Sequence, residues 1–143
     1  AWLATVFVPG ARDLAAWLAD GGGEERRRAV LAGAGRQVGL MHAAGVAHPD
    51  VNLRNLLVAA DDEVYLIDFD KAQVTPDPVS RGRRERDLRR LARSARKLEA
   101  NLTPADWAAF REGYGDDWPP GLDLSKPPKD EAKADGSAND AEE

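Results

Sequence analysis

Apolar and polar residues are distributed along the chain in blocks that predict a mixed structure of helices and strands. A short, partly β-branched apolar run at residues 2–8 ends at Pro9-Gly10, which predicts a strand followed by a turn. Apolar residues then recur at helical spacing within residues 11–20 and 24–45, which predicts two helices. The second helix contains three interior glycines. Each costs about 1 kcal/mol relative to alanine, so we expect a packing or functional reason for them.

The second half of the chain passes from strand periodicity to helical periodicity. Residues 55–69 place two apolar runs on either side of a polar corner at 61–63, which predicts a β-hairpin. Residues 81–100 put leucine and alanine on one stripe and arginines elsewhere, which is typical of an amphipathic helix. One more helix is predicted over residues 102–110. Together these elements predict an α+β fold that is mainly helical and has a small β-hairpin.

The start of the last predicted helix is marked by its residue types. Thr103 can cap the helix, Pro104 suits the first turn, and Asp106 completes a capping box. Trp107 and Phe110 then follow at helical spacing. We expect both aromatic side chains to face the core.

Length, net charge and cysteine content limit the classes of protein to which the chain can belong. The 143 residues fit one domain, and seven acids against three lysines from Asp123 onward contribute −4 to the formal net charge of −5. With almost no apolar residues to bury, a tail over residues 119–143 is expected to be disordered. The chain has no cysteine, which excludes disulfides and thiolate metal sites. It also lacks an apolar run of about 18 residues, so no membrane-spanning helix is predicted.

Polar residues gather around the predicted hairpin. Asn55 opens its first strand, and Asp68 follows thirteen residues later where the second strand ends. Because a hairpin brings its two ends together, we expect a carboxylate and an amide oxygen to converge there, a donor set that suits Mg²⁺. Asp50, on the preceding loop, would be a base that orients a hydroxyl. This arrangement is that of a phosphoryl-transfer site.

Structural roles compete with these assignments. Aspartate and asparagine are common in turns and caps, so each of these residues could serve the backbone alone. For Asn52, a local hydrogen bond in the loop and a role in catalysis are both open. We expect His48 to be structural, bonding loop backbone, and His42 to lie on a helix surface. With two histidines and no cysteine, a zinc site is not expected.

The arginine-rich helix also has two interpretations. Residues 81–97 hold eight arginines and one lysine against Glu85 and Asp87, a net charge of +7. These side chains could form a solvated face, or they could contact an anionic acceptor or an anionic membrane surface. No aromatic interleaving or nucleic-acid module accompanies the charge, so nucleic acid is not expected as a partner.

Two segments carry a family resemblance. "GVAHPDVNLRNLLV" (45–58) and "VYLIDFDKA" (64–72) resemble the catalytic and metal-binding loops of the protein-kinase-like superfamily. In detail they resemble the 3-deoxy-D-manno-octulosonic acid (Kdo) kinases of the lipopolysaccharide kinase family. That family favours Asp-x-Asn-x-x-Asn in the loop and Ile-Asp-Phe-Asp with a basic residue at the strand end. The resemblance covers roughly residues 2–114 and implies the mainly helical C-terminal lobe of a kinase-like fold.

The resemblance implies a role for each matching position. The catalytic residues would be Asp50, as base, and Asn52, near the transferred phosphate, with Asn55 and Asp68 as the Mg²⁺ ligands. Nucleotide-binding residues would be Phe7 and Val8 in the hinge, with Leu57 and Ile67 as an apolar floor. Acceptor-binding residues would be Arg54, Asp70, Lys71, Arg86 and Arg90. ATP and Mg²⁺ are the implied cofactors.

The chain also departs from the kinase pattern. Asp70 replaces the glycine of Asp-Phe-Gly, and Pro49 replaces the arginine of His-Arg-Asp. No glycine-rich phosphate loop or lysine-bearing strand precedes the motifs. We therefore expect a fragment: residues 1–10 as the last strand and hinge of an absent N-lobe, 11–118 as the C-lobe, and 119–143 as the tail.

The function expected from the resemblance is ATP-dependent transfer of a phosphate to a sugar hydroxyl. The expected acceptor is Kdo of a lipid A precursor, an anionic glycolipid, in lipopolysaccharide core biosynthesis. The expected location is the cytoplasmic face of the inner membrane, held peripherally. The alternatives are a heptose kinase, an aminoglycoside- or choline-type phosphotransferase, and a non-catalytic pseudokinase module.

Overall fold

The computed structural model describes residues 10–127. Its helices are α1 (Leu14–Ala19), α2 (Glu24–Ala43), α3 (Arg81–Lys97) and α4 (Pro104–Tyr114). Its strands are β1 (Arg12–Asp13), β2 (Val46–Ala47), β3 (Leu56–Val58), β4 (Val64–Leu66) and β5 (Gln73–Val74), and a 3₁₀ turn, η1, spans Leu53–Asn55. The expected α+β character, mainly helical with small antiparallel sheets, is confirmed. The strand predicted over residues 2–8, with Phe7 and Val8, lies outside the described residues.

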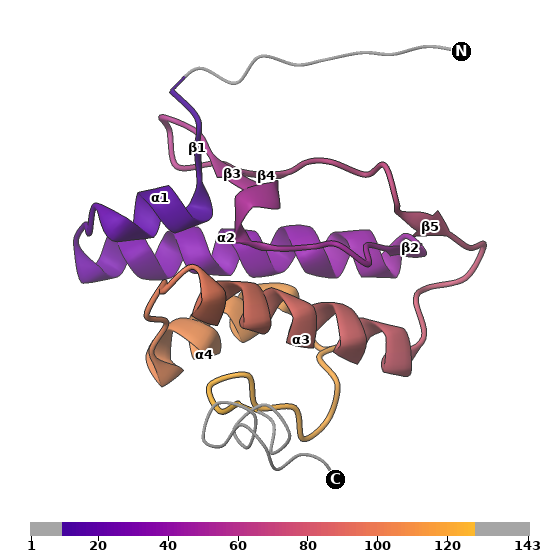
Figure 1. The fold of residues 1–143 in the computed structure, drawn as a ribbon. Helices are drawn as coiled ribbons and strands as arrows, with labels where there is room; N and C mark the ends of the chain where they lie inside the picture. The colour runs from indigo at the N-terminus through magenta and orange to yellow at the C-terminus, as the bar shows by residue number, and fades with distance from the viewer. Residues whose placement is uncertain (1–9, 128–143) are drawn as a thin grey trace, which may run out of the picture.

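The predicted hairpin is formed by β3 and β4, which pair antiparallel with Leu57 opposite Tyr65. A third strand was not predicted: β1 pairs with β3, so Arg12 and Asp13 are extended rather than part of a helix over 11–20. Helix α1 begins only at Leu14, because the Asp13 side chain accepts a hydrogen bond from the Ala16 amide and caps it. The small sheet lies on one side of α2, and α3 and α4 lie on the other (Figure 1).

Two of the three interior glycines of α2 allow this helix to pack closely against α4. A Cβ atom added at Gly35 would lie 1.9 Å from the Phe110 carbonyl oxygen, and one at Gly39 would lie 2.5 Å from that of Tyr114. From α4, a Cβ atom at Gly113 would lie 1.8 Å from the Ala32 carbonyl oxygen. Ordinary side chains cannot fit at these separations. Backbone contact between the two helices is therefore the packing reason for these glycines, whereas the third interior glycine of α2, Gly33, faces the Val64 side chain of β4.

The start of α4 is capped as predicted. The Thr103 hydroxyl accepts from the Asp106 amide at 3.1 Å, and the Asp106 carboxylate accepts from the Thr103 amide at 2.9 Å. Arg27 on α2 donates to both oxygens of the same carboxylate, at 3.0 and 2.8 Å. Burial acts to raise the pKa of Asp106, but the hydrogen bonds from Arg27 and Thr103 and the charge of Arg27 outweigh it, so its pKa lies below the usual range.

We expect Asp106→Asn to lower the free energy of unfolding by about 1–3 kcal/mol at pH 7, because it removes charge-assisted bonds to Arg27. A carboxyl whose pKa is lower in the folded state stabilises fully above its unfolded pKa. That stabilisation is lost as the pH falls through the folded pKa. Urea denaturation of the variant and the wild type at pH 7 and at about pH 3 measures the difference between their free energies of unfolding. This difference should be smaller at the lower pH. An equal loss at both pH values would contradict this account, and exposed Asp116→Asn is the control.

The aromatic residues of α4 lie in the core, as predicted, and the chain after α4 packs onto them. Phe110 is 1% exposed, and Trp118 meets it edge to face, with ring centroids 6.2 Å apart. Leu122 and Leu124 are buried in the same cluster. The expectation of a disordered tail starting at residue 119 is therefore wrong at these two leucines, whose apolar side chains complete the core.

Across residues 10–127, no helix combines the length and apolar character that crossing a bilayer requires.

Candidate active site

The loop between β2 and β3 is held at both ends by α3. At one end, the His48 amide donates to the Asp87 carboxylate at 2.9 Å. At the other, the Leu53 amide donates to the Ser94 hydroxyl at 3.1 Å. Asp87 and Ser94 are two helical turns apart on α3. Asp50 lies between the two attachment points, so α3 fixes the position of the loop that carries it.

Asp87 is also the centre of a buried polar network. The Nε2 atom of His42 lies 2.9 Å from the Asp87 carboxylate, and Nδ1 lies 2.7 Å from the Tyr114 hydroxyl. Since a carboxylate can only accept, Nε2 carries a proton and donates it to Asp87, while Nδ1 is hydrogen-bonded to the Tyr114 hydroxyl. Burial raises the pKa of Tyr114, which keeps its hydroxyl protonated. His42 is 1% exposed, so its expected place on a helix surface is wrong: it links α2, α3 and α4.

We expect Asp87→Asn to lower the free energy of unfolding by about 1–2 kcal/mol, because it weakens two buried charge-assisted hydrogen bonds without changing side-chain size. Guanidinium denaturation of the variant and the wild type measures the change. Glu85→Gln is the matched control, since it neutralises a half-buried carboxylate on the same helix, one that pairs with Arg89 near the surface. Equal losses of unfolding free energy in the two variants would show that the buried hydrogen bonds of Asp87 stabilise the fold no more than the surface pair of Glu85.

The two ends of the hairpin meet as the sequence predicts. The Asn55 backbone carbonyl accepts from the Ile67 amide at 2.8 Å, which places Asn55 beside the residue before Asp68. The buried Asn55 side chain accepts from the Asn52 amide at 3.1 Å through Oδ1 and keeps a second lone pair on that atom. Asp68 has a φ of 68°, in the left-handed region that aspartate tolerates better than most residues. This conformation turns the chain immediately after β4.

A pocket of about 400 Å³ brings together the four residues predicted for catalysis and metal binding and one predicted acceptor residue, Arg90. Its lining comprises Asp50, Val51, Asn52, Asn55, Asp68, Arg90, Arg93, Ser94 and Lys97. The predictions did not include Arg93, Ser94 and Lys97. Their spacing from Arg90 places all four on one face of the arginine-rich helix, a signal that the sequence did contain.

The donor set of this pocket fits a magnesium ion. Mg²⁺ is commonly bound by one or two carboxylates while its other positions are filled by water and substrate phosphates. In this pocket the Asp68 carboxylate would supply the charged ligand, and the Asn55 amide oxygen would supply a neutral oxygen ligand beside it. Within residues 10–127, no group of three or more histidine, cysteine, aspartate or glutamate side chains converges as a metal cage. The pocket therefore suits an ion shared with a substrate rather than one enclosed by the protein.

The Asn52 side chain is engaged in shaping the loop. Its Oδ1 accepts from the Arg54 amide at 2.7 Å, and its Nδ2 donates to the Asp50 carbonyl at 3.1 Å. With Asn55 it forms a capping box around η1. Of the two interpretations of Asn52, the local hydrogen bond is the one observed.

Several other predicted residues do not line the pocket. The Lys71 ammonium is 3.6 Å from the Asp50 carboxylate, and both side chains are at least half exposed. Leu57 and Ile67 lie on the outward face of the hairpin, where Ile67 is 38% exposed. The predicted acceptor residues outside the lining are all exposed: Arg54, Asp70, Lys71 and Arg86.

His48 is structural through its backbone amide. Its ring is buried and packs against Phe69, with ring centroids 5.5 Å apart. Neither ring nitrogen has a hydrogen-bond partner among the described residues, so the expected bond from the ring to loop backbone is not found. The ring instead provides an apolar contact between the loop and the Asp-Phe-Asp segment.

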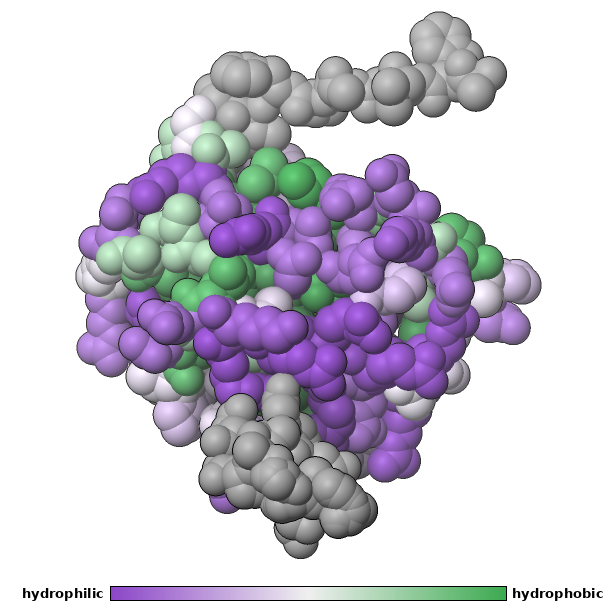
Figure 2. Space-filling model, in the orientation of Figure 1, coloured by the Kyte–Doolittle hydropathy of each residue, from purple (hydrophilic) through white to green (hydrophobic). Residues whose placement is uncertain are grey.

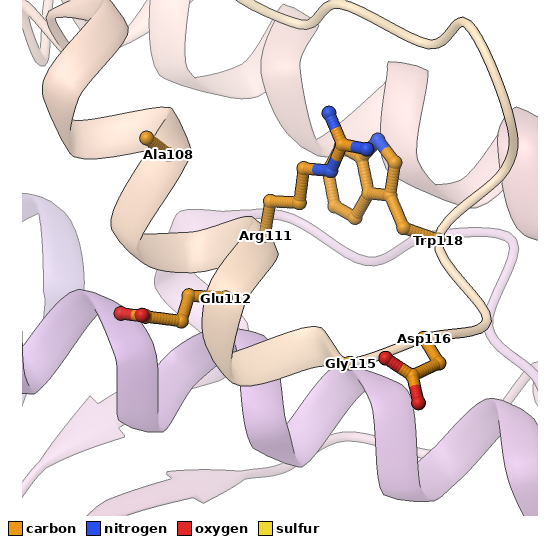
Figure 3. A pocket seen from close by; sticks show the side chains of 6 residues that line it. All are labelled: Ala108, Arg111, Glu112, Gly115, Asp116 and Trp118. Atoms are coloured by element: carbon orange, nitrogen blue, oxygen red, sulfur yellow. The ribbon is translucent and has the colours of Figure 1, made fainter.

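A second hollow, of about 490 Å³, lies at the end of α4 (Figure 3). The Arg111 guanidinium stacks over the Trp118 ring there, 6.0 Å from its centroid. Glu112 and Asp116 also line it. It contains none of the residues predicted for catalysis or metal binding, so the candidate active site is the pocket between the loop, the hairpin and α3.

Comparison with known proteins identifies the family of the chain. Residues 1–114 match the Lipopolysaccharide kinase (Kdo/WaaP) family. Because this match covers most of the chain, the chain belongs to that family.

Curated relatives carry the name 3-deoxy-D-manno-octulosonic acid kinase. The chain is 40% identical over 89 residues to one from Xanthomonas oryzae pv. oryzae (strain PXO99A), covering 62% of this chain and 35% of the relative. It is 42% identical over 89 residues to one from Xanthomonas campestris pv. campestris (strain B100), with the same coverage. It is 36% identical over 91 residues to one from Vibrio cholerae serotype O1, covering 63% of this chain and 36% of the relative. The chain thus spans about a third of the length of these relatives.

Proposed function

We propose that this chain carries the hydroxyl-activating and metal-binding residues of an ATP-dependent kinase that phosphorylates a sugar. The proposed acceptor is Kdo of a lipid A precursor. The observation that carries the proposal is the single pocket lined by Asp50, Asn55 and Asp68. Membership of the Kdo/WaaP family and the names of the relatives support the same chemistry.

In the proposed reaction, Asp50 accepts the proton of the acceptor hydroxyl as its oxygen attacks the γ-phosphorus of ATP. The bond between that phosphorus and the bridging oxygen breaks, and ADP leaves. The Asp50 carboxylate is half exposed, and its pair with Lys71 at 3.6 Å is a weak surface contact. A substrate hydroxyl can therefore replace the ammonium as its partner.

Asn55 and Asp68 would hold Mg²⁺, which supplies neutralisation of phosphate charge when bound. The hydrogen bond from Ile67 to Asn55 and the left-handed backbone of Asp68 hold the two ligands in place before substrate arrives. Asn52 contributes by fixing the loop, since its side-chain oxygen and amide both bond backbone. The protein's part in the reaction is thus mainly positioning.

The outward face of the hairpin would form the apolar floor of the nucleotide site. Leu57 and Tyr65 are paired neighbours on this face, and Ile67 continues it. Tyr65 and Ile67 are exposed large apolar side chains, 43% and 38% accessible. Exposed apolar surface beside a metal site is suited to covering by a nucleotide base. The family resemblance further suggests that the enzyme works at the cytoplasmic face of an inner membrane, held peripherally.

The test is transfer of labelled γ-phosphate from ATP by the protein as its gene encodes it. A Kdo-bearing lipid A precursor should be phosphorylated when Mg²⁺ is present and not when it is chelated by EDTA. A heptose-bearing core acceptor, an aminoglycoside and choline serve as comparison substrates. Transfer to one of these alone would replace the proposed acceptor, and the absence of transfer to any acceptor would favour a non-catalytic role.

A further inference from the structure

Positive charge from α3 forms part of the candidate active site. Arg90, Arg93 and Lys97 line the same pocket as Asp50 and Asp68. Spacings of three and four residues place these cations on one face of the helix. Hydrophilic side chains dominate the molecular face on which α3 lies (Figure 2). The pocket is therefore divided chemically between two carboxylates and three cations.

Arg90 is the most enclosed of the three cations. Its Nε atom is buried and has no hydrogen-bond partner among residues 10–127. A buried donor left unpaired is unfavourable, and structures seldom keep one without a reason. Since Arg90 lines the pocket, an anion entering the pocket would reach its guanidinium.

The positions of these cations suit the acceptor better than the nucleotide. The hydrogen bond from the Leu53 amide to the Ser94 hydroxyl joins α3 directly to the loop that carries Asp50. In the proposed reaction Asp50 meets the acceptor hydroxyl, whereas the triphosphate would lie with the ion on Asn55 and Asp68. Arg90, Arg93 and Lys97 flank Ser94 along α3. They therefore surround the attachment point of the acceptor-activating loop.

We propose that Arg90, Arg93 and Lys97 bind an anionic group of the acceptor, a carboxylate or a phosphate, and so select acidic sugars over neutral ones. The inference rests on the proposed function and adds its specificity-determining residues. Guanidinium and ammonium groups donate charge-assisted hydrogen bonds to both kinds of anion, with arginine able to do so through two parallel bonds. The pocket volume of about 400 Å³ is within the range of small-molecule sites.

The experiment compares the wild type with Arg93→Gln/Lys97→Gln, a double variant of two exposed side chains that should fold normally. Arg90→Gln is tested separately. Steady-state kinetics should show KM for a Kdo-bearing lipid A acceptor raised by about tenfold or more, the loss expected from one charge-assisted hydrogen bond. KM for ATP should be unchanged. Arg89→Gln, which removes one arginine of α3 outside the pocket, is the matched control.

Modified acceptors identify the anion. One has the Kdo carboxylate converted to its methyl ester, and another lacks the lipid A phosphates. For the wild type, KM for one of the modified acceptors should be about tenfold higher than KM for the unmodified acceptor. For the variants, the two KM values should be similar. Equal discrimination by the wild type and the variants, or none by either, would overturn the inference while leaving the proposed function intact. If the wild type transfers phosphate to no sugar, the proposed function itself has failed, and this inference fails with it.

Discussion

Asp50→Asn should lower kcat for phosphate transfer by about 10²–10⁴-fold, the range typical of losing a positioned general base. Asparagine matches the size of the side chain but cannot take the proton of the acceptor hydroxyl. The substitution should leave the fold intact, because the carboxylate is half exposed and its pair with Lys71 is a surface contact. Both KM values should change far less than kcat, since the acceptor and the nucleotide are held by other residues.

Single-turnover transfer of labelled phosphate, with thermal unfolding measured in parallel, checks this result. Asp61→Asn is the control: Asp61 accepts a hydrogen bond from the Glu63 amide at the far corner of the same hairpin, and asparagine can keep that bond. Asp61→Asn should retain wild-type activity. An Asp50→Asn protein as active as the wild type would remove Asp50 from the role of base and leave the metal assignment unaffected.

Gly113→Ala should lower the free energy of unfolding by about 3 kcal/mol or more, at the upper end of overpacking effects. The added Cβ atom would lie 1.8 Å from the Ala32 carbonyl oxygen, so α2 and α4 would have to separate. A clash with the far end of a flexible side chain could be relieved by a rotamer change, but a clash with backbone cannot. The close approach also continues at Gly35 and Gly39, so the strain cannot be confined to one turn.

Gly82→Ala provides the matched control on α3, because a Cβ atom there would have nothing within 4 Å. It should stabilise the protein by about 0.5–1 kcal/mol through the intrinsic preference of helices for alanine. Urea denaturation of both variants tests the pair of expectations. The packing account would be refuted if the two substitutions changed stability in the same direction.

The sequence predicts those features that follow from local patterns. The capping box of Thr103 and Asp106 and the pairing of β3 with β4 both depend on residues near one another in the chain, and both are found. Asn55 and Asp68 are thirteen residues apart, but the hairpin turns that separation into proximity. The loop motif adds Asp50 to the same pocket.

Features that depend on tertiary contact could not be predicted in this way. Asp87 lies in an arginine-rich helix, where the charge pattern predicts exposure, yet it is buried because His42 arrives from α2 and the His48 amide from the loop. The strand pairing of Arg12 could not be predicted for the same reason, because it depends on Val58, which is distant in the sequence. Leu122 and Leu124 pack the start of the tail onto the core. The composition of a segment does not show which of its individual residues make such tertiary contacts.

The attachment of the loop to α3 has a consequence for local unfolding. The amides of His48 and Leu53 are bonded to side chains of α3, not to neighbouring strands. The two amides can therefore exchange with solvent only when these bonds to the helix break, so their rate of exchange reports how often the loop separates from α3. While the bonds hold, the loop keeps Asp50 at a fixed position relative to the cations of α3. Each separation would interrupt the alignment between the proton acceptor and the groups proposed to hold the acceptor's charge.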